Sequence, residues 1–510
     1  MPDSASSFAS YYHERTKYHP DTIAAKNKVL DWGNQPSVFK EYKIGTIYDL
    51  QPYLSPSQGR DPDTESWERI SRLLACSYGL TAKIATMGNP IYLRTAPSAG
   101  GLYPAEVYLI SRGTKLLPAG LYSYQPLTHT LVHFWVSEVW TKLKEACFGH
   151  WALKHTNLAL VTTAIFYRSA WRYEDRAYRR IFLDTGHLLG NIELASALYG
   201  YFPHLIGGFR DAAMNELFYL DSHQESVLTA IALTDLQATA FPPTEKKQTA
   251  LPSPVHRNIP PVADGELLTQ FHQATEIQEF KQDDESSELA PSSSGNDKYN
   301  FPFCLKISTL SPPIHWGKYL VELEKTILYR RSTRAYTGGN LTFDELKALL
   351  SFTYQPQDYE SQNLPLNPDY FDLSLIQTFI AVSGVTGLEE GCYYYAPQAQ
   401  ELRQIRFKNF RKELHYLCLG QDLGRDASVV IFHTADLEQA VQKYGDRAYR
   451  YLHLDAGHLG QRLNLGAIQL GLGVSGIGGF FDDQVNEVLG IPEDEAVLYI
   501  TTLGRPRLSN

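Results

Sequence analysis

The chain contains one stretch of sequence twice. Residues 173–188 read Tyr-Glu-Asp-Arg-Ala-Tyr-Arg-Arg-Ile-Phe-Leu-Asp-Thr-Gly-His-Leu, and 11 of these 16 positions recur without a gap at 444–459. The same offset of 271 residues pairs 120–124 with 391–395 and 206–209 with 477–480. Solenoid repeats are only about 20–50 residues long, so a period of this length indicates duplicated domains. We therefore predict two domains that face each other as a fused pseudo-dimer.

The two copies differ at complementary places. The first copy has a glycine-bearing loop, Pro-Ser-Ala-Gly-Gly-Leu-Tyr-Pro at 97–104, whose counterpart at 368–375 keeps only the opening proline. The second copy has basic clusters at 330–334 (Arg-Arg-Ser-Thr-Arg) and 505–507 (Arg-Pro-Arg), where the first copy has none. Each copy has lost what the other retains. This indicates one shared site assembled from both halves.

The composition excludes several classes of protein. A net charge of −10 over 510 residues argues against a broad nucleic-acid surface, although a local arginine cluster can still bind one anionic group. The five cysteines include no Cys-x-x-Cys pair, which suits a reducing cytoplasm and argues against a disulfide framework or a thiolate metal site. Neither an export signal nor a membrane-length apolar run is readable. We expect a cytoplasmic protein without membrane or nucleic-acid partners.

Apolar spacing predicts an α+β fold in each copy, because strands and helices are interleaved without strict alternation. Each half has one long helix, at 176–199 and 447–470, that should be the centre of its domain. Shorter predicted elements are a helix at 67–78, a hairpin at 121–124 and 131–134, and strands at 107–110, 158–166, 227–233 and 497–503.

The chain divides into four parts. The two domains span 61–237 and 301–510, and residues 1–60 form an N-terminal arm or a small recognition segment. The segment 238–300 is rich in proline, serine and acidic residues, which predicts a linker. An amphipathic stripe within it predicts one helix that either docks on a domain or grips a peptide: Leu267, Leu268, Phe271, Ala274 and Ile277.

Two arginine clusters could bind a phosphate. Arg330, Ser332 and Arg334 lie at alternate positions, so two guanidinium groups and a hydroxyl can converge, and a planar guanidinium matches a phosphate bidentately. Arg505 and Arg507 repeat this spacing. Either cluster alone is more often a solvated charged face. Together, on an acidic chain and absent from the sister half, they favour a phosphate site.

Two glycine-rich segments could approach a flat ring. The small residues at 98–101 let the backbone come close to a ligand, and the Ser98 hydroxyl could donate to a ring carbonyl. The alternative is a plain turn before the strand at 107–110. The sequence Gly-Ile-Gly-Gly-Phe at 476–480 likewise offers backbone amides, with a helix C-cap as the alternative.

Lys443 and Tyr444 are the candidate catalytic residues. They precede the second long helix, whereas the first half has Arg172 and Tyr173 at this place, and an arginine cannot deprotonate. A lysine beside an aromatic hydroxyl can have its pKa lowered by desolvation or by a neighbouring cation, and can then take part in proton transfer.

No metal site is predicted. Asp184 and His187, repeated as Asp455 and His458, could present two ligands at helical spacing, but no third ligand is visible. Structural hydrogen bonds within each domain explain the repeated pair better.

The motifs, in their order along the chain, resemble those of nitroreductase-type flavoenzymes. The resemblance is specifically to the thiazoline and oxazoline dehydrogenases that mature ribosomally made peptides, the cyanobactin oxidase and SagB-like group. The resemblance spans about residues 90–235 and 328–508. It rests on Pro-Ser-Ala-Gly-Gly at 97–101, Arg-x-Ser-x-Arg at 330–334, Lys-Tyr-Gly-Asp-Arg at 443–447, Gly-Gly-Phe at 478–480 and the final Arg-x-Arg. It implies two tandem nitroreductase-like domains, each with a mixed sheet flanked by helices, the first degenerate and the second anchoring the coenzyme.

The resemblance also implies a bound FMN, which this family holds at a dimer interface. Its phosphate would be held by Arg330, Ser332, Arg334, Arg505 and Arg507. The ribityl chain and the ring would lie against Pro97, Ser98, Ala99, Gly100, Gly101, Gly478 and Gly479, with Gln421 as a further candidate.

The implied reaction is FMN-dependent oxidation of an azoline. Thiazolines or oxazolines in a heterocyclised precursor peptide would become aromatic azoles, with Tyr444 or Lys443 removing a ring proton, the flavin accepting a hydride and oxygen reoxidising the flavin. A cyclodehydratase and a second copy of the chain are further implied partners. Two alternatives stay open: an NAD(P)H-dependent nitro or quinone reductase, and a non-catalytic peptide-binding scaffold built on a flavin fold.

Overall fold

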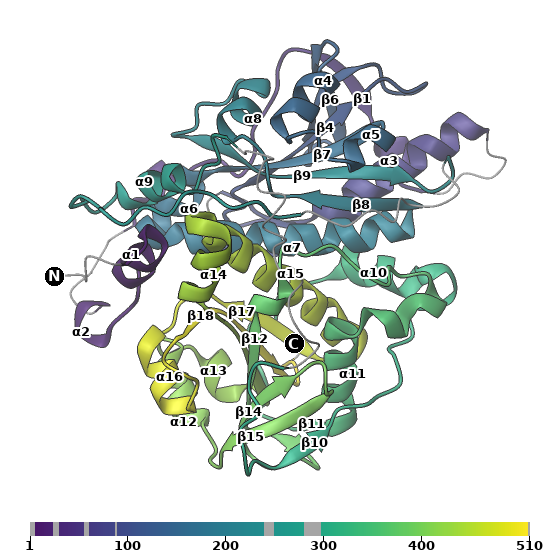
Figure 1. The fold of residues 1–510 in the computed structure, drawn as a ribbon. Coiled ribbons are helices and arrows are strands. Elements are labelled where there is room, and N and C mark those ends of the chain that lie inside the picture. Colours follow the sequence, from purple (N-terminus) through teal and green to yellow (C-terminus); the bar gives the residue numbers. More distant parts are fainter. Residues whose placement is uncertain are drawn as a thin grey trace.

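The computed structural model describes residues 6–23, 30–55, 61–86, 89–238, 249–279 and 297–507. The acid- and serine-rich part of the predicted linker, 280–296, lies outside these residues. The two copies form two lobes that meet along two long helices (Figure 1). The predicted α+β class and the pseudo-dimer of two domains are confirmed.

Each lobe is built on a seven-stranded sheet, and both sheets have the same strand order. The first sheet runs β1-β6-β5-β4-β7-β9-β8: Thr46–Asp49, Thr130–Val136, Gly120–Gln125, Ala105–Ser111, Leu158–Ile165, Glu225–Asp235 and Tyr201–Ile206. The second runs β10-β15-β14-β12-β16-β18-β17: Lys306–Ser308, Glu401–Arg406, Gly391–Ala396, Gln377–Val382, Val429–Asp436, Glu495–Gly504 and Gly473–Ile477. Each strand therefore has a counterpart in the other lobe.

All neighbouring strands in both large sheets are antiparallel. Parallel pairing is described for β11 (Leu341–Thr342) with β13 (Val385–Thr386), in a separate two-stranded sheet. Another small sheet pairs β2 (Leu80–Ile84) with β3 (Ile91–Arg94). The large sheets thus differ from the mixed sheets that the resemblance implied, since apolar runs locate a strand but not its direction.

Helices cover the sheets and fill the space between the lobes (Figure 1). The first half contains α1 (Phe8–Arg15), α2 (Pro20–Ile23), α3 (Pro62–Tyr78), α4 (Trp140–Ala146), α5 (Ala152–His155), α6 (Phe166–Tyr173), α7 (Ala177–Leu198) and α8 (Asp211–Leu217). The linker contributes α9 (Leu267–Ala274). The second half contains α10 (Val321–Tyr329), α11 (Phe343–Tyr354), α12 (Arg411–Leu417), α13 (Asp422–Asp426), α14 (Leu437–Tyr444), α15 (Ala448–Gln469) and α16 (Asp482–Leu489).

The helices begin at residues suited to capping. Asp61 accepts hydrogen bonds from the backbone amides of Asp63 and Thr64 at the start of α3. Thr342 and Glu345 form a capping box at the start of α11. The helices predicted at 67–78, 176–199 and 447–470 are found as α3, α7 and α15.

The two long helices, α7 and α15, pack against each other at the centre of the molecule (Figure 1). Both are buried on nearly all sides, as expected for helices enclosed between two layers. At their crossing, a Cβ on Gly457 would lie 2.2 Å from the carbonyl oxygen of Leu183, and a Cβ on Gly186 would lie 2.2 Å from that of Leu454. Only glycine permits this approach, which explains the glycine in the repeated Asp-x-Gly-His sequence.

The N-terminal helix α1 and the linker helix α9 occupy equivalent positions beside this crossing. Residues 13–16 and 272–275 both read His-x-x-Thr. The histidine carbonyl and the threonine hydroxyl accept hydrogen bonds from Arg179 in the first case (2.6 and 3.0 Å) and from Arg450 in the second (2.9 and 2.7 Å). These two segments are 259 residues apart, so a comparison of the two copies at the offset of 271 residues does not pair them. The apolar stripe predicted for α9 is buried: Leu267, Leu268, Phe271, Ala274 and Ile277.

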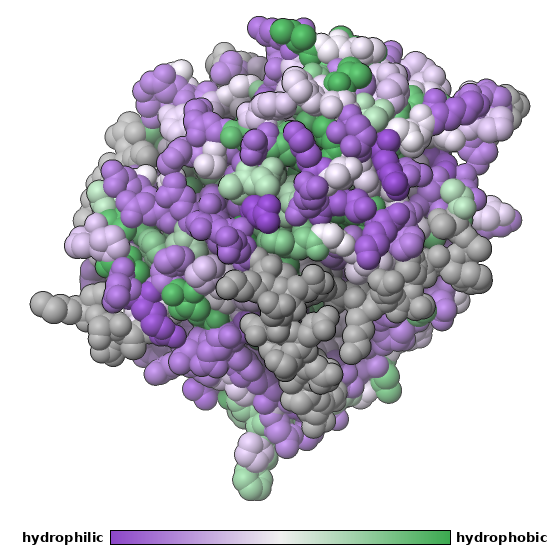
Figure 2. Space-filling model, turned by 45° about the horizontal axis from the view of Figure 1, so that its top comes forward, coloured by the Kyte–Doolittle hydropathy of each residue, from purple (hydrophilic) through white to green (hydrophobic). Residues whose placement is uncertain are grey.

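The face of the molecule shown in Figure 2 is largely hydrophilic where the structure describes it. On the face shown in Figure 2, hydrophobic residues form small groups separated by hydrophilic ones. Within the described ranges, no helix is both long enough and apolar enough to cross a membrane.

We expect Gly457→Ala to destabilise the protein by about 3 kcal/mol or more, because the added methyl group meets backbone atoms that cannot move aside. Gly466→Ala in the same helix is the control. Its methyl group would meet the side chains of Leu349 and Phe352 at 3.1 and 3.2 Å, which can shift. Thermal unfolding should show a lower Tm for Gly457→Ala alone, and equal Tm values would contradict this close approach of the two helices.

Candidate functional site

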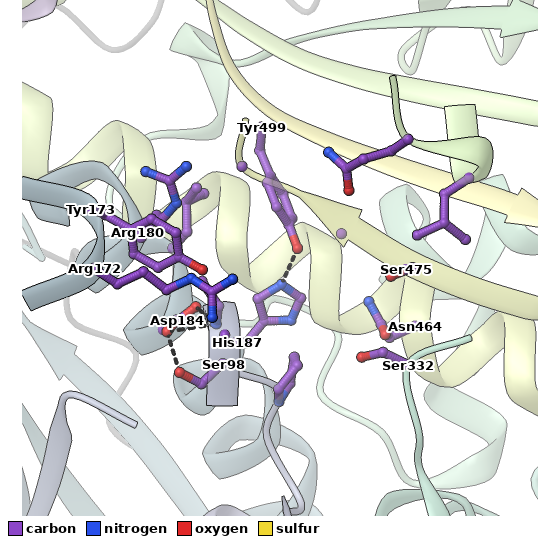
Figure 3. A pocket seen from close by; sticks show the side chains of 18 of the residues that line it. Ser98, Arg172, Tyr173, Arg180, Asp184, His187, Ser332, Asn464, Ser475 and Tyr499 are labelled. Carbon is purple, nitrogen blue, oxygen red and sulfur yellow. Dashed lines mark hydrogen bonds between the residues drawn. The ribbon is translucent and has the colours of Figure 1, made fainter. Parts of the chain in front are cut away.

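A cavity of about 340 Å³ lies between the two halves. Its lining from the first half is Pro97, Ser98, Ala99, Gly100, Arg172, Tyr173, Arg180, Leu183, Asp184 and His187. Its lining from the second half is Ser332, Arg334, Gln421, Leu423, Asn464, Ser475, Gly476, Gly478 and Tyr499. In the view of Figure 3, Arg172, Tyr173 and Arg180 lie on one side, and Ser332, Asn464 and Ser475 on the other.

Asp184 on α7 holds the glycine-bearing loop of the first half. Its Oδ2 accepts hydrogen bonds from Ser98 Oγ at 2.6 Å and from the Ala99 amide at 3.1 Å. The amide of Tyr103 in turn donates to Ser98 Oγ at 2.9 Å. The Ser98 hydroxyl therefore donates to Asp184, whereas the sequence predicts a bond to a ring carbonyl. Burial raises the pKa of Asp184 to about 7, against the opposing effect of these hydrogen bonds.

A chain of hydrogen bonds across the interface fixes the tautomer of His187. The Ser77 carbonyl accepts from Asn191 Nδ2 (3.2 Å), and Asn191 Oδ1 accepts from Gln461 Nε2 (2.6 Å). Gln461 Oε1 then accepts from His187 Nδ1 (2.8 Å), so His187 Nε2 carries no proton and accepts from the Tyr499 hydroxyl (2.8 Å; Figure 3). Burial lowers the pKa of His187 to about 3, so the ring stays neutral. These bonds cross between the halves, whereas the prediction kept them within one domain.

A cationic and aromatic wall closes one side of the cavity. The Arg180 guanidinium lies 3.9 Å from the centroid of the Tyr173 ring, and that of Arg172 lies 5.6 Å from it. Arg180 Nη1 is buried and has no hydrogen-bond partner in the described part of the chain. Burial raises the pKa of Tyr173, although Arg180 and Arg172 act to lower it, so the phenol keeps its proton at neutral pH. Gly100, at φ 66°, faces this phenol, and a Cβ there would lie 2.8 Å from the hydroxyl.

The predicted phosphate residues separate in the structure. Ser332 and Arg334 line the cavity, and no carboxylate pairs with Arg334 among the described residues. Arg330 lies outside the lining and joins the halves, with Nε donating to the Thr95 carbonyl at 2.6 Å. Burial lowers the pKa of Arg330 to about 10.

The C-terminal arginines also lie outside the cavity lining. Arg505 donates to both carboxylate oxygens of Glu345 at 2.8 and 2.7 Å, and Glu345 belongs to the capping box of α11. The backbone amide of Arg507 donates to the carbonyl of Ala335, one residue beyond Arg334, and its side chain is exposed.

The predicted ring-contacting residues mostly meet at the cavity. Six of them line it: Pro97, Ser98, Ala99, Gly100, Gln421 and Gly478. Gly101 and Gly479 do not, but Gly479 lines a larger adjoining hollow.

This hollow has a volume of about 1200 Å³ and shares part of its wall with the cavity, including Gly100, Tyr173 and Arg180. Its remaining lining includes residues 15–18, Thr22 and Ile23 of the arm, Asp264, Gly265 and residues 267–269 of the linker, and Phe166, Tyr167 and Ala170 of α6. The cavity thus opens into a space bounded by both domains together with the arm and the linker.

Lys443 and Tyr444 lie away from the cavity. Lys443 Nζ lies 2.5 Å from Asp372 Oδ2, and the Tyr444 hydroxyl donates to the same oxygen at 3.0 Å. Lys443 lines a separate hollow of about 740 Å³ within the second half. Arg172 and Tyr173, their counterparts in the first half, face the cavity instead. The catalytic role of Lys443 and Tyr444 stays a prediction that their position does not favour.

The place related to the cavity by the duplication is filled. Tyr370 stacks on His458 and Phe371 on Tyr451, with ring centroids 4.3 and 4.7 Å apart. The linker adds Thr249, whose carbonyl accepts from the amide of Gly207 at 2.7 Å and whose hydroxyl donates to the Tyr370 carbonyl at 2.9 Å. A space of about 20 Å³ remains there. We call this the closed side and the cavity the open side.

Sequence reasoning missed several residues of the lining, namely Arg172, Tyr173, Arg180, Asp184, His187, Asn464, Ser475 and Tyr499. The offset of 271 could have indicated some of them. It pairs Arg180 with Tyr451 and Asn464 with Glu193. In the strand registers, Tyr499 lies opposite His433 and Thr229 lies opposite Thr162, which makes Thr229 the counterpart of Tyr499. The open side therefore differs from the closed side in charge and polarity.

The sequence profile of the nitroreductase family matches residues 66–233 and 327–505. The chain belongs to the nitroreductase family. The crystal structure of a candidate nitroreductase from Anabaena variabilis ATCC 29413, at 1.80 Å resolution, is 65% identical, covers 98% of this chain and 100% of its own, and has a TM-score of 0.93. MJ1384 of Methanocaldococcus jannaschii, another candidate nitroreductase, is 32% identical over 173 residues, which are 34% of this chain and 86% of MJ1384.

Two further relatives are named as processing proteins. The microcin B17-processing protein McbC of Escherichia coli is 29% identical over 133 residues, which are 25% of this chain and 49% of McbC. The trifolitoxin-processing protein TfxB of Rhizobium leguminosarum bv. trifolii is 28% identical over 179 residues, which are 34% of this chain and 48% of TfxB. The matches thus cover about half of each processing protein.

Nitroreductase family proteins generally bind FMN, and the open side fits this coenzyme. The unpartnered Nη1 of Arg180 and the free guanidinium of Arg334 suit an anionic ligand. The backbone carries no side chain at Gly100, Gly476 and Gly478. A Cβ on Gly476 would lie 1.8 Å from the Tyr499 hydroxyl. A flat ring can therefore approach the chain where side chains would collide.

We expect Asp184→Asn to weaken the dependence of stability on pH. The pKa of Asp184 in the folded protein, about 7, lies above the ordinary value of about 3.9. Its contribution to stability is therefore full below about pH 4 and is lost as the pH rises through about 7. Asp455 on the closed side has a pKa raised by burial to about 7, so Asp455→Asn should act in the same direction. Tm measured from pH 5 to 8 should fall less in both variants than in the unaltered protein, and an unchanged slope would contradict this.

Proposed function

We propose that this protein is an FMN-dependent azoline oxidase that converts thiazolines or oxazolines in a ribosomally made peptide to aromatic azoles. Its main support is the opening of the cavity into a hollow of about 1200 Å³, which exceeds the usual size of a small-molecule site, about 300–1000 Å³, and suits a segment of peptide. The similarity to two peptide-processing proteins points to the same substrate class. A cytoplasmic location, a cyclodehydratase partner, oxygen as the final acceptor and homodimerisation belong to the same proposal.

Residues of the second half would hold the coenzyme phosphate. Ser332 and Arg334 provide a hydroxyl and a guanidinium group at the cavity, and Asn464 adds an amide where the closed side has Glu193. Replacing a carboxylate by an amide removes repulsion of a phosphate. Arg330 keeps the segment before Pro97 in place through the Thr95 carbonyl. Arg505 and Arg507 would act on the phosphate through long-range attraction only.

When bound, FMN supplies a ring that accepts a hydride. The chain supplies the surroundings. Ala99 and Gly100 would flank the ring from the first half, and Gly476 and Gly478 from the second half. Tyr173, whose hydroxyl keeps its proton at neutral pH, would donate a hydrogen bond to the peptide carbonyl beside the reacting carbon and so acidify the neighbouring C–H.

Arg334→Gln should weaken FMN binding about 10- to 100-fold, because one charge-assisted hydrogen bond contributes about 1.5–3 kcal/mol. Arg112→Gln is the matched control, since Arg112 is exposed on the first lobe and lies outside the cavity lining. Titration of the apoprotein with FMN, followed by quenching of flavin fluorescence, measures both affinities. Equal losses, or none, would contradict the assignment of the phosphate site.

Tyr173→Phe should slow the oxidation of a thiazoline-bearing peptide by about 100-fold or more, because a donor in the transition state is lost. Tyr444→Phe is the matched comparison from the closed side, and we expect it to retain activity. Mass spectrometry of the peptide over time, as loss of two hydrogens, measures both rates. Loss of activity in Tyr444→Phe alone would instead support the catalytic pair predicted from the sequence.

The same assays distinguish the alternatives. Steady NAD(P)H oxidation without peptide, and no mass loss with it, would support a nitro or quinone reductase. A colourless protein that retains no flavin yet binds the peptide would support a scaffold.

A further inference from the structure

Tyr18 of the N-terminal arm stands where the cavity opens into the hollow. It lines the hollow together with Gly478 and Arg180. Its backbone amide donates to Asp482 Oδ2 at 3.0 Å, and it forms a parallel β-bridge with Phe481. The second half therefore holds this residue of the arm in place at the rim of the site.

Arg180 connects Tyr18 with Tyr173. Its Nη2 donates to the Tyr18 hydroxyl at 3.5 Å, and its guanidinium lies 3.9 Å from the centroid of the Tyr173 ring. The guanidinium of Arg176 lies 4.2 Å from the centroid of the Tyr18 ring. Two phenols thus face the same hollow with one cation between them.

The closed side lacks this arrangement. In the repeated helices, the counterpart of Tyr18 is Ile277, whose amide donates to Asp211 Oδ2 at 2.8 Å in the same way. The counterpart of Arg180 is Tyr451. The phenol and the guanidinium that bridges it are therefore present together on the open side and absent together on the closed side, although the backbone contact is the same.

The two phenols differ in acidity. Burial acts to raise the pKa of Tyr18, but Arg180 and Arg176 outweigh it and lower the pKa. Burial raises the pKa of Tyr173. Groups whose surroundings move their pKa values apart are suited to opposite roles in proton transfer. The charged and titratable groups around Tyr18 are Arg176, Arg179 and Arg180 on α7 and its approach, Tyr173 on α6, Asp482 and Asp483 on α16, and Lys17 and His19 beside it in the arm.

We propose that Tyr18 is the proton acceptor of the reaction and that Arg180 holds it opposite Tyr173, the hydrogen-bond donor. This rests on the proposed azoline oxidation, in which the ring loses two hydrogens. The carbon beside the carbonyl gives its proton to the Tyr18 phenolate, which becomes a phenol. The neighbouring ring carbon gives up its hydrogen with the bonding electron pair to the flavin oxidant, and a carbon–carbon double bond forms. The phenol then releases its proton to solvent through the hollow.

The test compares Tyr18→Phe with Tyr11→Phe in the full-length, FMN-loaded protein. Tyr11 lies on the same arm, but its hydroxyl accepts from Arg15 at 2.7 Å and it does not line the hollow. In the unaltered protein, the rate of thiazoline oxidation should rise with pH through the ionisation of Tyr18. Tyr18→Phe should be about 100-fold slower or more and should lack this rise, whereas Tyr11→Phe should match the unaltered protein.

A titration of the protein without substrate gives a second readout. In protein labelled with ¹³C at tyrosine Cζ, one resonance should titrate with a pKa below the ordinary tyrosine value of about 10. It should be absent in Tyr18→Phe and present in Tyr11→Phe and Tyr173→Phe.

Two results would overturn the role of Tyr18 while leaving azoline oxidation intact: an active Tyr18→Phe that keeps the rise of rate with pH, or a spectrum in which Tyr18→Phe removes no early-titrating tyrosine. An unaltered protein with this resonance but no activity on thiazoline peptides would overturn the proposed function, and the role of Tyr18 as its base with it.

Discussion

The close approach of α7 and α15 is the contact on which the remaining architecture depends. Gly186 and Gly457 bring the two helix backbones together, so the lobes share one interface rather than two separate surfaces. Asp184 and His187 flank one glycine, and Asp455 and His458 flank the other. The crossing therefore places the loop anchors and the interface histidines of both copies close to a pseudo-two-fold axis. A single repeated Asp-x-Gly-His sequence thus serves helix packing, loop anchoring and the bonds between the halves.

Duplication created two equivalent places, and the chain has kept one of them open. On the closed side, Tyr370 and Phe371 fill the space with stacked rings, and the linker at Thr249 seals it through backbone hydrogen bonds. On the open side, small residues leave the backbone uncovered, and Arg172, Arg180 and Arg334 lack carboxylate partners among the described residues. Because apolar filling stabilises the interface, the closed side can stabilise the fold while the open side keeps unpaired polar groups for a ligand.

The arm and the linker are parts of the duplicated unit. Both insert a His-x-x-Thr helix against a buried pair of arginines and an aspartate. These are Arg176 and Arg179 with Asp482 in one case, and Arg447 and Arg450 with Asp211 in the other. Buried ion pairs of this kind require several hydrogen bonds to offset their desolvation, and the threonine hydroxyls and histidine carbonyls supply them. The segments that follow each helix then differ, so one wall of the hollow carries a phenol and its counterpart carries an aliphatic side chain.

The sequence alone determined the duplication, the two long helices, the α+β class and the idea of one site shared between halves, because these follow from local periodicity and from a comparison of the two copies. The coenzyme site that it predicts includes Ser332, Arg334 and most of the 97–101 loop, and these residues lie together at one cavity. Only the tertiary structure decided which tyrosine faces that cavity. The anchor Asp184 holds the loop of its own half, so Tyr173, at the end of the helix before α7, lies beside the loop, while Tyr444 bonds to Asp372. Likewise, Arg330 and Arg505 are occupied by a carbonyl and a carboxylate whose positions no local pattern reveals. Contacts between residues far apart in sequence settle such questions, since they depend on how the two lobes pack.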